Sequence, residues 1–158
     1  FGEDGLVTAA TSSPLTDGAV FMIVCSEDFA EKHNLNPLAR IVAGAVTGCE
    51  PHIMGIGPIE STKEVLRRSN WSVEDVDLFE LNEAFSSQSL AVINDLGINP
   101  EIVNLHGGAL AIGHPLGASG ARITGKAASL LHATKSKRAV ASMCIGGGMG
   151  ISIALEKI

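Results

Sequence analysis

Cys144 stands at the end of an apolar run and is followed by a loop with four glycines, at positions 146, 147, 148 and 150. A thiol can act as a nucleophile, an acid or a base, and exposed backbone N–H groups of glycines can stabilise a negatively charged oxygen. Taken alone, a cysteine at a strand end is more often a small hydrophobic residue, which is our interpretation of Cys25. The glycine loop favours a chemical role for Cys144.

Two further loops carry polar side chains among small residues. His114 lies in a Gly-His-Pro sequence inside the glycine-rich stretch 107–120, and an imidazole can exchange a proton near neutral pH. Asn82 opens the sequence Asn-Glu-Ala-Phe, where its amide could cap a helix or orient a water or a carbonyl group. Each loop alone is compatible with a structural role, and the three together predict an acyl-transfer site.

The elements that position these loops alternate between apolar runs and amphipathic helical stretches, which is typical of an α/β fold. Helices are expected at residues 26–32, 62–69, 82–96 and 117–133, and strands at residues 19–25, 38–46, 76–81, 102–105, 139–145 and 151–155. Ser61 and Glu64 have the spacing of a capping box at the start of the second helix. The short glycine connection between the last two strands predicts an antiparallel hairpin. The three polar loops then lie at strand ends, where catalytic groups gather in α/β sheets.

Composition excludes several classes of function. The chain has 11 Lys and Arg against 17 Asp and Glu, a net charge of −6, which argues against nucleic acid or an anionic membrane as a partner. No apolar stretch approaches the roughly 20 residues of a membrane span. Three cysteines without Cys-x-x-Cys spacing suit a reducing compartment and argue against a zinc site. The glycine loops lack the spacing of nucleotide-binding motifs.

Three motifs follow one another along the chain: Asn-Glu-Ala-Phe at 82–85, the Gly-His-Pro stretch at 107–122, and Cys-Ile-Gly-Gly-Gly-Met-Gly at 144–150. Together they resemble the C-terminal signatures of thiolases, and the similarity covers essentially the whole chain. The resemblance implies that residues 1–158 are a single thiolase C-terminal domain, the second of two similar α/β halves. It implies a five-stranded mixed sheet covered by helices on both faces.

The resemblance also implies transfer of acyl groups between coenzyme A thioesters, by Claisen condensation or by thiolysis. His114 would activate the nucleophilic thiol and help to hold the thioester oxygen, in an oxyanion hole where Asn82 positions a water. Cys144 would be the acid/base that takes a proton from the acetyl α-carbon, and the Gly146 N–H would contribute to a second oxyanion hole. The positions that correspond to contacts or lining of the pantetheine channel are Ser13, Met54, Ala84 and Phe85.

One role of the family has no residue here, because the nucleophilic cysteine of thiolases lies in the N-terminal half. Neither Cys25 nor Cys49 lies in a comparable motif. We therefore expect the isolated chain to lack thiolase turnover. The implied partners are acyl-CoA and CoA as substrates, with no metal or other cofactor, and an N-terminal thiolase half within a dimer or tetramer. An isolated half would expose an apolar interface, so we expect it to self-associate.

The subclass and two other functions stay open. Most motifs favour an acetyl-CoA acetyltransferase, whereas Pro14 stands where many of these enzymes have glycine and is closer to degradative 3-ketoacyl-CoA thiolases of longer chain preference. The missing nucleophile also fits a non-catalytic acyl-CoA binding or assembly module. A third possibility is a hydrolase that uses Cys144 and His114 directly. We expect a cytoplasmic location, with mitochondria and peroxisomes left open.

Overall fold

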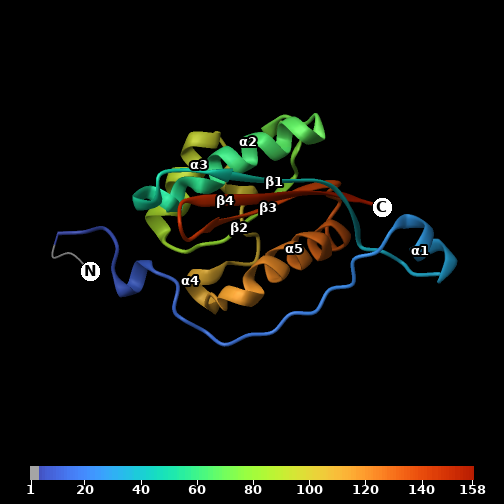
Figure 1. Ribbon diagram of the computed structural model, residues 1–158, viewed down its shortest axis with the longest axis horizontal. Coiled ribbons are helices and arrows are strands. Elements are labelled where there is room, and N and C mark those ends of the chain that lie inside the picture. Colours follow the sequence, from blue (N-terminus) through green and yellow to red (C-terminus); the bar gives the residue numbers. More distant parts are fainter. Residues whose placement is uncertain (1–3) are drawn as a thin grey trace.

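The computed structural model describes residues 4–158 and has one mixed sheet between two layers of helices (Figure 1). Within these residues the four strands are β1 (Ala39–Gly48), β2 (Leu78–Leu81), β3 (Arg138–Ile145) and β4 (Met149–Lys157). They lie in the order β1-β4-β3-β2, with β2 parallel to β3 and with β4 antiparallel to both β3 and β1. The prediction of an α/β fold with a mixed sheet is confirmed.

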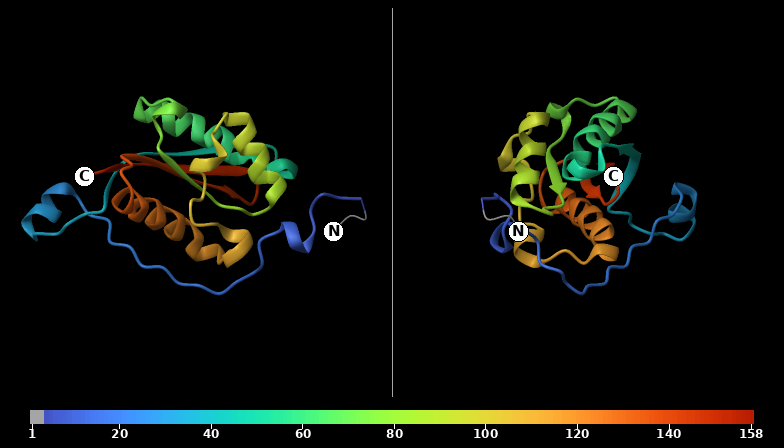
Figure 2. Two further views of the ribbon diagram at one scale, coloured as in Figure 1. Left: turned by 180° about the vertical axis from the view of Figure 1, so that it is seen from behind. Right: turned by 60° about the vertical axis from the view of Figure 1, so that its left-hand side comes forward.

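Helices cover both faces of this sheet (Figure 2). One layer holds α2 (Gly57–Ser69) and α3 (Ser86–Leu96), the other holds α4 (Ala109–Ile112) and α5 (Leu116–Ala133), and α1 (Glu27–Lys32) lies to the side. Short 3-10 turns are η1 (Ala9–Thr11), η2 (Pro51–Ile56), η3 (Val73–Asp75) and η4 (Pro100–Ile102). Buried apolar side chains form one cluster on each face of the sheet, so each layer of helices has its own core.

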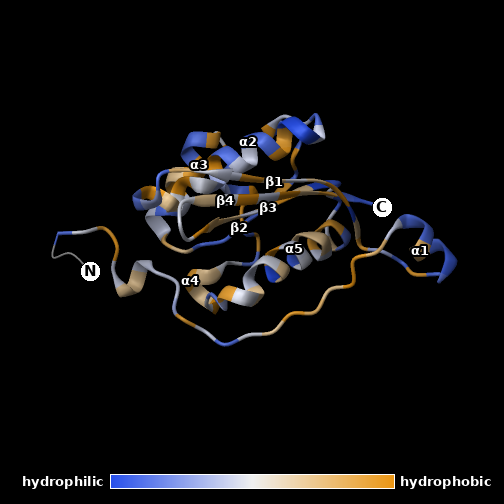
Figure 3. Cartoon of the chain, viewed as in Figure 1, coloured by the Kyte–Doolittle hydropathy of each residue, from blue (hydrophilic) through white to orange (hydrophobic). Residues whose placement is uncertain are grey.

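The five-stranded sheet implied by the resemblance is wrong for residues 4–158, where the sheet has four strands. Residues 19–25, predicted as a strand, are extended but make no backbone hydrogen bond to any strand that the structure describes. The segment runs outside α5, which separates it from the sheet, and it is coloured as a hydrophobic stretch in Figure 3. Phe21 and Ile23 are 96% and 86% exposed. Its apolar composition correctly indicated extended backbone, but no sheet edge of the described chain lies beside it.

The strand predicted at residues 102–105 is reduced to a single bridge, in which Val103 pairs with Phe79 of β2 in parallel. The 3-10 turn η4 precedes this bridge, and Asn104 follows it with a positive φ of 48°. The Asn104 side chain then makes the hydrogen bonds that the backbone of a neighbouring strand would make to Leu81. Its Nδ2 donates to Leu81 O at 2.8 Å, and its Oδ1 accepts from Leu81 N at 2.9 Å. Strand pairing beside β2 ends after one residue because a side-chain amide satisfies the next backbone pair.

Two predicted helix starts are also wrong. The capping box expected from Ser61 and Glu64 does not form, because Ser61 lies inside α2 and its buried hydroxyl is 2.7 Å from Ser152 Oγ. Asn82 does not cap a helix, since α3 begins at Ser86. Ser61 has a hydrogen-bonding partner from a distant strand, and Asn82 lies several residues before the helix. The local sequence reveals neither of these facts.

Glu80 is a carboxylic acid inside β2, a strand that the alternation of residues 76–81 predicted to be only half-buried. It is 1% exposed, and its Oε1 has no hydrogen-bond partner among the described residues. Burial raises the pKa of Glu80 from 4.5 to about 7, although the positive charges of Arg122 and Lys126 oppose the shift. The carboxyl is therefore neutral over much of the mildly acidic range.

The buried Glu80 carboxyl predicts a pH-dependent stability. The folded chain keeps the proton up to about pH 7 and the unfolded chain releases it near pH 4.5, so the free energy of unfolding should fall as the pH rises between these values. In Glu80→Gln this fall should disappear. At pH 8 the free energy of unfolding of the variant should exceed that of the wild type by about 2–3 kcal/mol. Urea unfolding at pH 5 and pH 8 measures both, with Glu101→Gln at an exposed side chain as control. The same pH dependence in wild type and E80Q would contradict the prediction.

Candidate active site

Asn82 lies at the carboxyl end of β2, where its backbone N–H donates to Ser142 O of β3 at 2.9 Å. Because β2 and β3 are parallel, their carboxyl ends meet at one edge of the sheet, which also carries Cys144. Asn82 is fully buried, and its Oδ1 has no partner among the described residues. A buried amide oxygen destabilises the fold unless a water or a ligand donates to it, which indicates a binding position at this edge.

His114 lies where α4 and α5 meet, on a backbone held at several points. Gly113 ends α4 with a φ of 92°, a conformation that favours glycine, and His114 N donates to Pro14 O at 3.1 Å. His114 Nδ1 is 2.6 Å from Ser119 Oγ, and that hydroxyl donates its hydrogen to Pro115 O at 3.1 Å. Since a hydroxyl has one hydrogen, Nδ1 is assigned as the donor and Nε2 as the unprotonated nitrogen, which accepts from Asn82 Nδ2.

The structure brings Asn82 and His114 together, with 3.4 Å between Asn82 Nδ2 and His114 Nε2. Burial, and then the positive charge of Arg122, lower the pKa of His114 below its ordinary value of 6.5. The imidazole is therefore neutral at neutral pH and has a basic nitrogen at Nε2, as a general base requires. An open pocket of about 360 Å³ gives access to this ring and is lined by Leu15, Thr16, Asp17, His114 and Leu116.

Cys144 is the last buried residue of β3, and residues 146–148 form the turn of the predicted antiparallel hairpin, which is confirmed. The thiol is 7% exposed, and burial raises the pKa of Cys144 above its ordinary value of 9.0. It is therefore protonated at neutral pH, able to donate a proton, and its thiolate is a strong base once formed. A side chain at Gly146 would meet no atom within 4 Å, so the backbone of this residue borders open space.

Three of the predicted substrate-binding residues lie together at the end of β2. Ser13 donates from its backbone N and its Oγ to Ala84 O, at 3.0 and 3.2 Å. Ser12 forms an antiparallel bridge with Phe85, and Leu15 forms a parallel bridge with His114. The N-terminal segment therefore joins the turn that follows Asn82 to the loop that carries the imidazole.

Met54, the fourth predicted substrate-binding residue, lies in η2, where its carbonyl oxygen is 4.0 Å from Cys49 Sγ. Cys49 N donates to Gly148 O at 2.8 Å, which ties this segment to the hairpin after Cys144. The site thus has two parts, the Asn82–His114 pair and the cysteine hairpin. Within residues 4–158 no hydrogen bond joins Cys144 to either member of that pair.

Sequence reasoning missed two residues that shape the site. Ser119 fixes the imidazole, and a hydroxyl about one helical turn beyond His114 was a signal that could have found it. Cys49 contributes to the raised pKa of Cys144, but only the fold of the hairpin brings the two thiols near each other, so no local signal exists.

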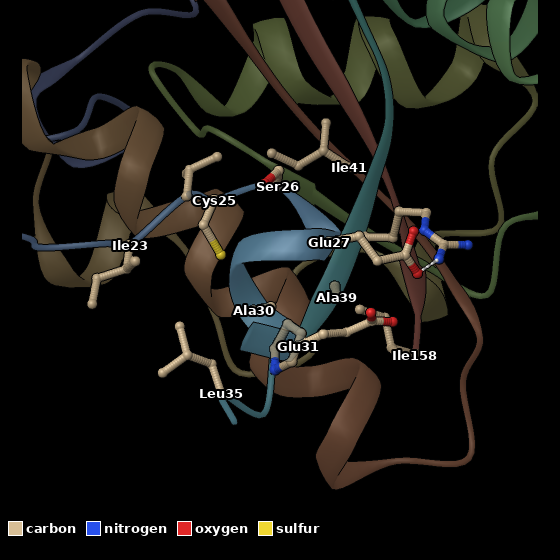
Figure 4. A pocket seen from close by; sticks show the side chains of 13 residues that line it. Ile23, Cys25, Ser26, Glu27, Ala30, Glu31, Leu35, Ala39, Ile41 and Ile158 are labelled. Carbon is tan, nitrogen blue, oxygen red and sulfur yellow. Dashed lines mark hydrogen bonds and ion pairs between the residues drawn. The ribbon is translucent and has the colours of Figure 1, made fainter. Parts of the chain in front are cut away.

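A separate cavity of about 480 Å³ lies beside α1 and the start of β1 (Figure 4). Its lining is largely apolar and includes Ile23, Cys25 and Ile158, but none of the predicted site residues. In the part of the chain that the structure describes, no cluster of three His, Cys, Asp or Glu side chains could hold a metal ion. No helix of residues 4–158 has the length and apolar character needed to cross a membrane.

Comparison with known proteins decides the family. Residues 35–157 match the family described as thiolase, C-terminal domain. The chain belongs to this family. An acetyl-CoA acetyltransferase of Paracoccus denitrificans is 48% identical over 99% of this chain and 40% of its own length. A 3-ketoacyl-CoA thiolase of Marinobacter nauticus is 51% identical over 99% of this chain and 41% of its own length.

A solved structure shows the same thiolase fold at full coverage of the chain. The human mitochondrial 3-ketoacyl-CoA thiolase in complex with CoA superposes with a TM-score of 0.94 and 45% identity, over 100% of this chain and 40% of that one. The chain therefore spans about 40% of the length of the relatives it matches.

Proposed function

We propose that the chain is the C-terminal catalytic domain of an acetyl-CoA C-acetyltransferase, which transfers acyl groups between CoA thioesters by Claisen condensation and thiolysis. The observation that carries the proposal is the contact of 3.4 Å between Asn82 Nδ2 and His114 Nε2 beside the carboxyl end of β3. Thiolase relatives that share nearly half of the residues support the class of reaction. Residues 1–158 would form one domain of the complete enzyme.

The Asn82–His114 pair would form the first of two centres. The neutral His114 imidazole, whose Nε2 is assigned as the unprotonated nitrogen, would take the proton of the nucleophilic thiol and help to hold the thioester oxygen. The unpartnered Oδ1 of Asn82 supports a bound water, because a water hydrogen would satisfy this buried acceptor. That water would stabilise the oxygen that becomes negative in the transition state.

Cys144 would form the second centre. Its thiolate would remove a proton from the acetyl α-carbon, and the electron pair of that C–H bond would then form the new C–C bond to the acyl carbon. The thioester C–S bond of the acyl-enzyme would break, and the leaving thiolate would take the proton from Cys144. The raised pKa of Cys144 supports this role, because a more basic thiolate is better matched to a carbon acid. The Gly146 N–H, which borders open space, would stabilise the enolate oxygen.

Coenzyme A would be a substrate, and no other cofactor is proposed. Its pantetheine arm would pass along Ser13, Met54, Ala84 and Phe85. Three of these residues line the turn that follows Asn82, which supports one continuous channel wall. Pro14 and the identity of 51% to a 3-ketoacyl-CoA thiolase favour a second candidate, a degradative thiolase for longer acyl chains.

Two alternatives from other classes are less well supported. A hydrolase would use the Cys144 thiolate as its nucleophile, whereas burial raises the pKa of Cys144 and keeps the thiol protonated. A pure acyl-CoA binding module would not need an imidazole whose tautomer is fixed by Ser119. Both alternatives remain outcomes of the test below.

A further partner would be an N-terminal thiolase half that supplies the nucleophilic cysteine. The exposed apolar segment 19–25 supports this partner, because an unpaired extended strand is suited to join the edge of another sheet. Exposed apolar side chains of β1, including Ile41 and Val46, support association as well. We infer a homo-oligomer, dimer or tetramer, for the complete enzyme, and a cytoplasmic location from three free cysteines.

The proposal predicts that the 158-residue chain alone has no turnover and forms no acyl adduct. Intact-mass measurement after incubation with acetyl-CoA should show the unmodified chain, and acetoacetyl-CoA thiolysis should be absent. In a chimera, this chain replaces the matching segment of the Paracoccus denitrificans acetyl-CoA acetyltransferase; we expect both thiolysis and one acetyl adduct on the Paracoccus part.

Each alternative gives a different result. An adduct on Cys144 of the isolated chain, with release of acetate, would support the hydrolase. An inactive, folded chimera together with acetyl-CoA binding by the isolated chain would support the binding module. Activity with acetoacetyl-CoA well below activity with longer 3-ketoacyl-CoA substrates would favour the degradative subclass.

A further inference from the structure

Glu83 follows Asn82 directly and makes two hydrogen bonds with the loop that leads to His114. Its Oε1 accepts from Asn104 Nδ2 at 2.8 Å, and its Oε2 accepts from Leu110 N at 3.1 Å. Both partners are donors, and a carboxylate accepts at both oxygens, so an amide side chain here could satisfy only one of them. Glu83 makes no ion pair within residues 4–158, so its charge serves hydrogen bonds alone.

The two partners of Glu83 belong to opposite ends of one segment. Asn104 is fixed to β2 through both backbone groups of Leu81, at 2.8 and 2.9 Å. Leu110 lies in α4, which ends at Gly113 immediately before His114. The carboxylate therefore joins the end of β2, from which Asn82 extends, to the short helix that places the imidazole.

Gly108 shows how closely this segment approaches the carboxylate. A Cβ at Gly108 would overlap Glu83 Cδ, so a side chain at this position would have to displace the carboxylate. The φ of Gly108 is −137°, an extended conformation open to any residue, so glycine is needed here for the approach and not for the backbone angle. The close contact and the two hydrogen bonds leave the segment little freedom against Glu83.

We propose that Glu83 is a positioning residue, which acts through α4 to hold the His114 imidazole against the Asn82 amide. The importance of this role for catalysis rests on the proposed function, in which His114 and Asn82 are the groups that contact the substrate. The inference concerns the geometry of the pair, so it can be tested on the full 158-residue chain without turnover.

Hydrogen exchange at the imidazole C2 position, followed by peptide mass spectrometry, measures the pKa of each histidine at micromolar concentration. In Glu83→Gln we expect the pKa of His114 to rise toward 6.5, because a displaced ring loses the burial that lowers it. A purely electrostatic effect would instead lower the pKa of His114, since removal of a negative charge near the ring disfavours the imidazolium. The other charges that face His114 are Arg122 of α5 and Asp17 in the same open pocket, and both are kept.

Gly108→Ala provides an independent second variant, because it displaces the carboxylate without changing any charge. It should raise the pKa of His114 as Glu83→Gln does and speed amide exchange at Leu110. Gly117→Ala is the matched control, since a Cβ there meets nothing within 4 Å, and Glu101→Gln controls for the lost charge at an exposed side chain. His52 and His132, followed in the same spectra, serve as internal references.

The outcomes separate this inference from the proposed function. A raised pKa of His114 in both variants, with controls at the wild-type value, supports the positioning role even if the chimera is inactive. An unchanged or lowered pKa in either folded variant overturns it. Failure of both variants to fold also overturns it, because the carboxylate would then stabilise the whole domain instead of the pair.

Discussion

Replacement of Gly148 by alanine should lower the free energy of unfolding by about 2–5 kcal/mol. Gly148 has a φ of 89°, where an L side chain adds roughly 1–2 kcal/mol of strain. The new Cβ would also overlap Cys49 O and lie 3.0 Å from Pro51 N, and both are backbone atoms that have no rotamer with which to move away. Overpacking of this kind typically costs about 1–3 kcal/mol.

Gly147→Ala is the matched control for Gly148→Ala. Gly147 has nearly the same φ, 87°, but a Cβ there would meet no atom within 4 Å, so only the strain of about 1–2 kcal/mol remains. Urea unfolding of the two variants, followed by circular dichroism, isolates the contact between the hairpin and η2. Equal losses of stability at both positions would show that this contact is not tight. The contact matters for the site because the same hairpin carries Gly146 next to Cys144.

Much of the fold could be predicted from the sequence because its signals are local. Ser26 accepts a hydrogen bond from Phe29 N at the start of α1, and Gly97 ends α3 with a φ of 65°, as the capping preferences of serine and glycine require. The hairpin of β3 and β4 follows from the glycine turn. Asn82 and Cys144 were also correctly placed at strand ends, since the parallel strands β2 and β3 bring their carboxyl ends to one edge, whereas His114 lies between α4 and α5.

The remaining features depend on contacts between distant residues, which no local pattern encodes. An apolar run predicts extended backbone, but whether residues 19–25 join a sheet depends on what lies beside them, and α5 separates them from the sheet of the described chain. The strand at 102–105 ends early because the Asn104 side chain bonds to Leu81, 23 residues away. Glu83 shows the same limit in the site, since its hydrogen bonds to Asn104 and Leu110 form only once the loop has folded onto β2.

Replacement of Cys144 by alanine in the chimera should lower thiolysis and condensation by about 10²–10⁴-fold, the usual loss when a general acid or base is removed. The substitution removes a buried thiol and adds no bulk, so the fold should be kept at a small loss of stability. Cys25→Ala is the control because Cys25 is exposed, lies outside the sheet and has no predicted role, so it should retain activity within about twofold.

Acetyl transfer from acetyl-CoA to the enzyme, measured without the carbon–carbon step, shows whether Cys144 is an acid/base or a nucleophile. If Cys144 only moves protons, the C144A chimera should still take up one acetyl group from acetyl-CoA, because the acyl group resides on the other half and only the carbon–carbon step is lost. Intact-mass measurement of the chimera shows this directly. Loss of the adduct in C144A, with the adduct mapped to Cys144 in the parent chimera, would make this thiol the nucleophile and reverse the assignment. The raised pKa of Cys144 favours the first result, since a protonated, buried thiol is a poor nucleophile at neutral pH and its thiolate, once formed, is a strong base.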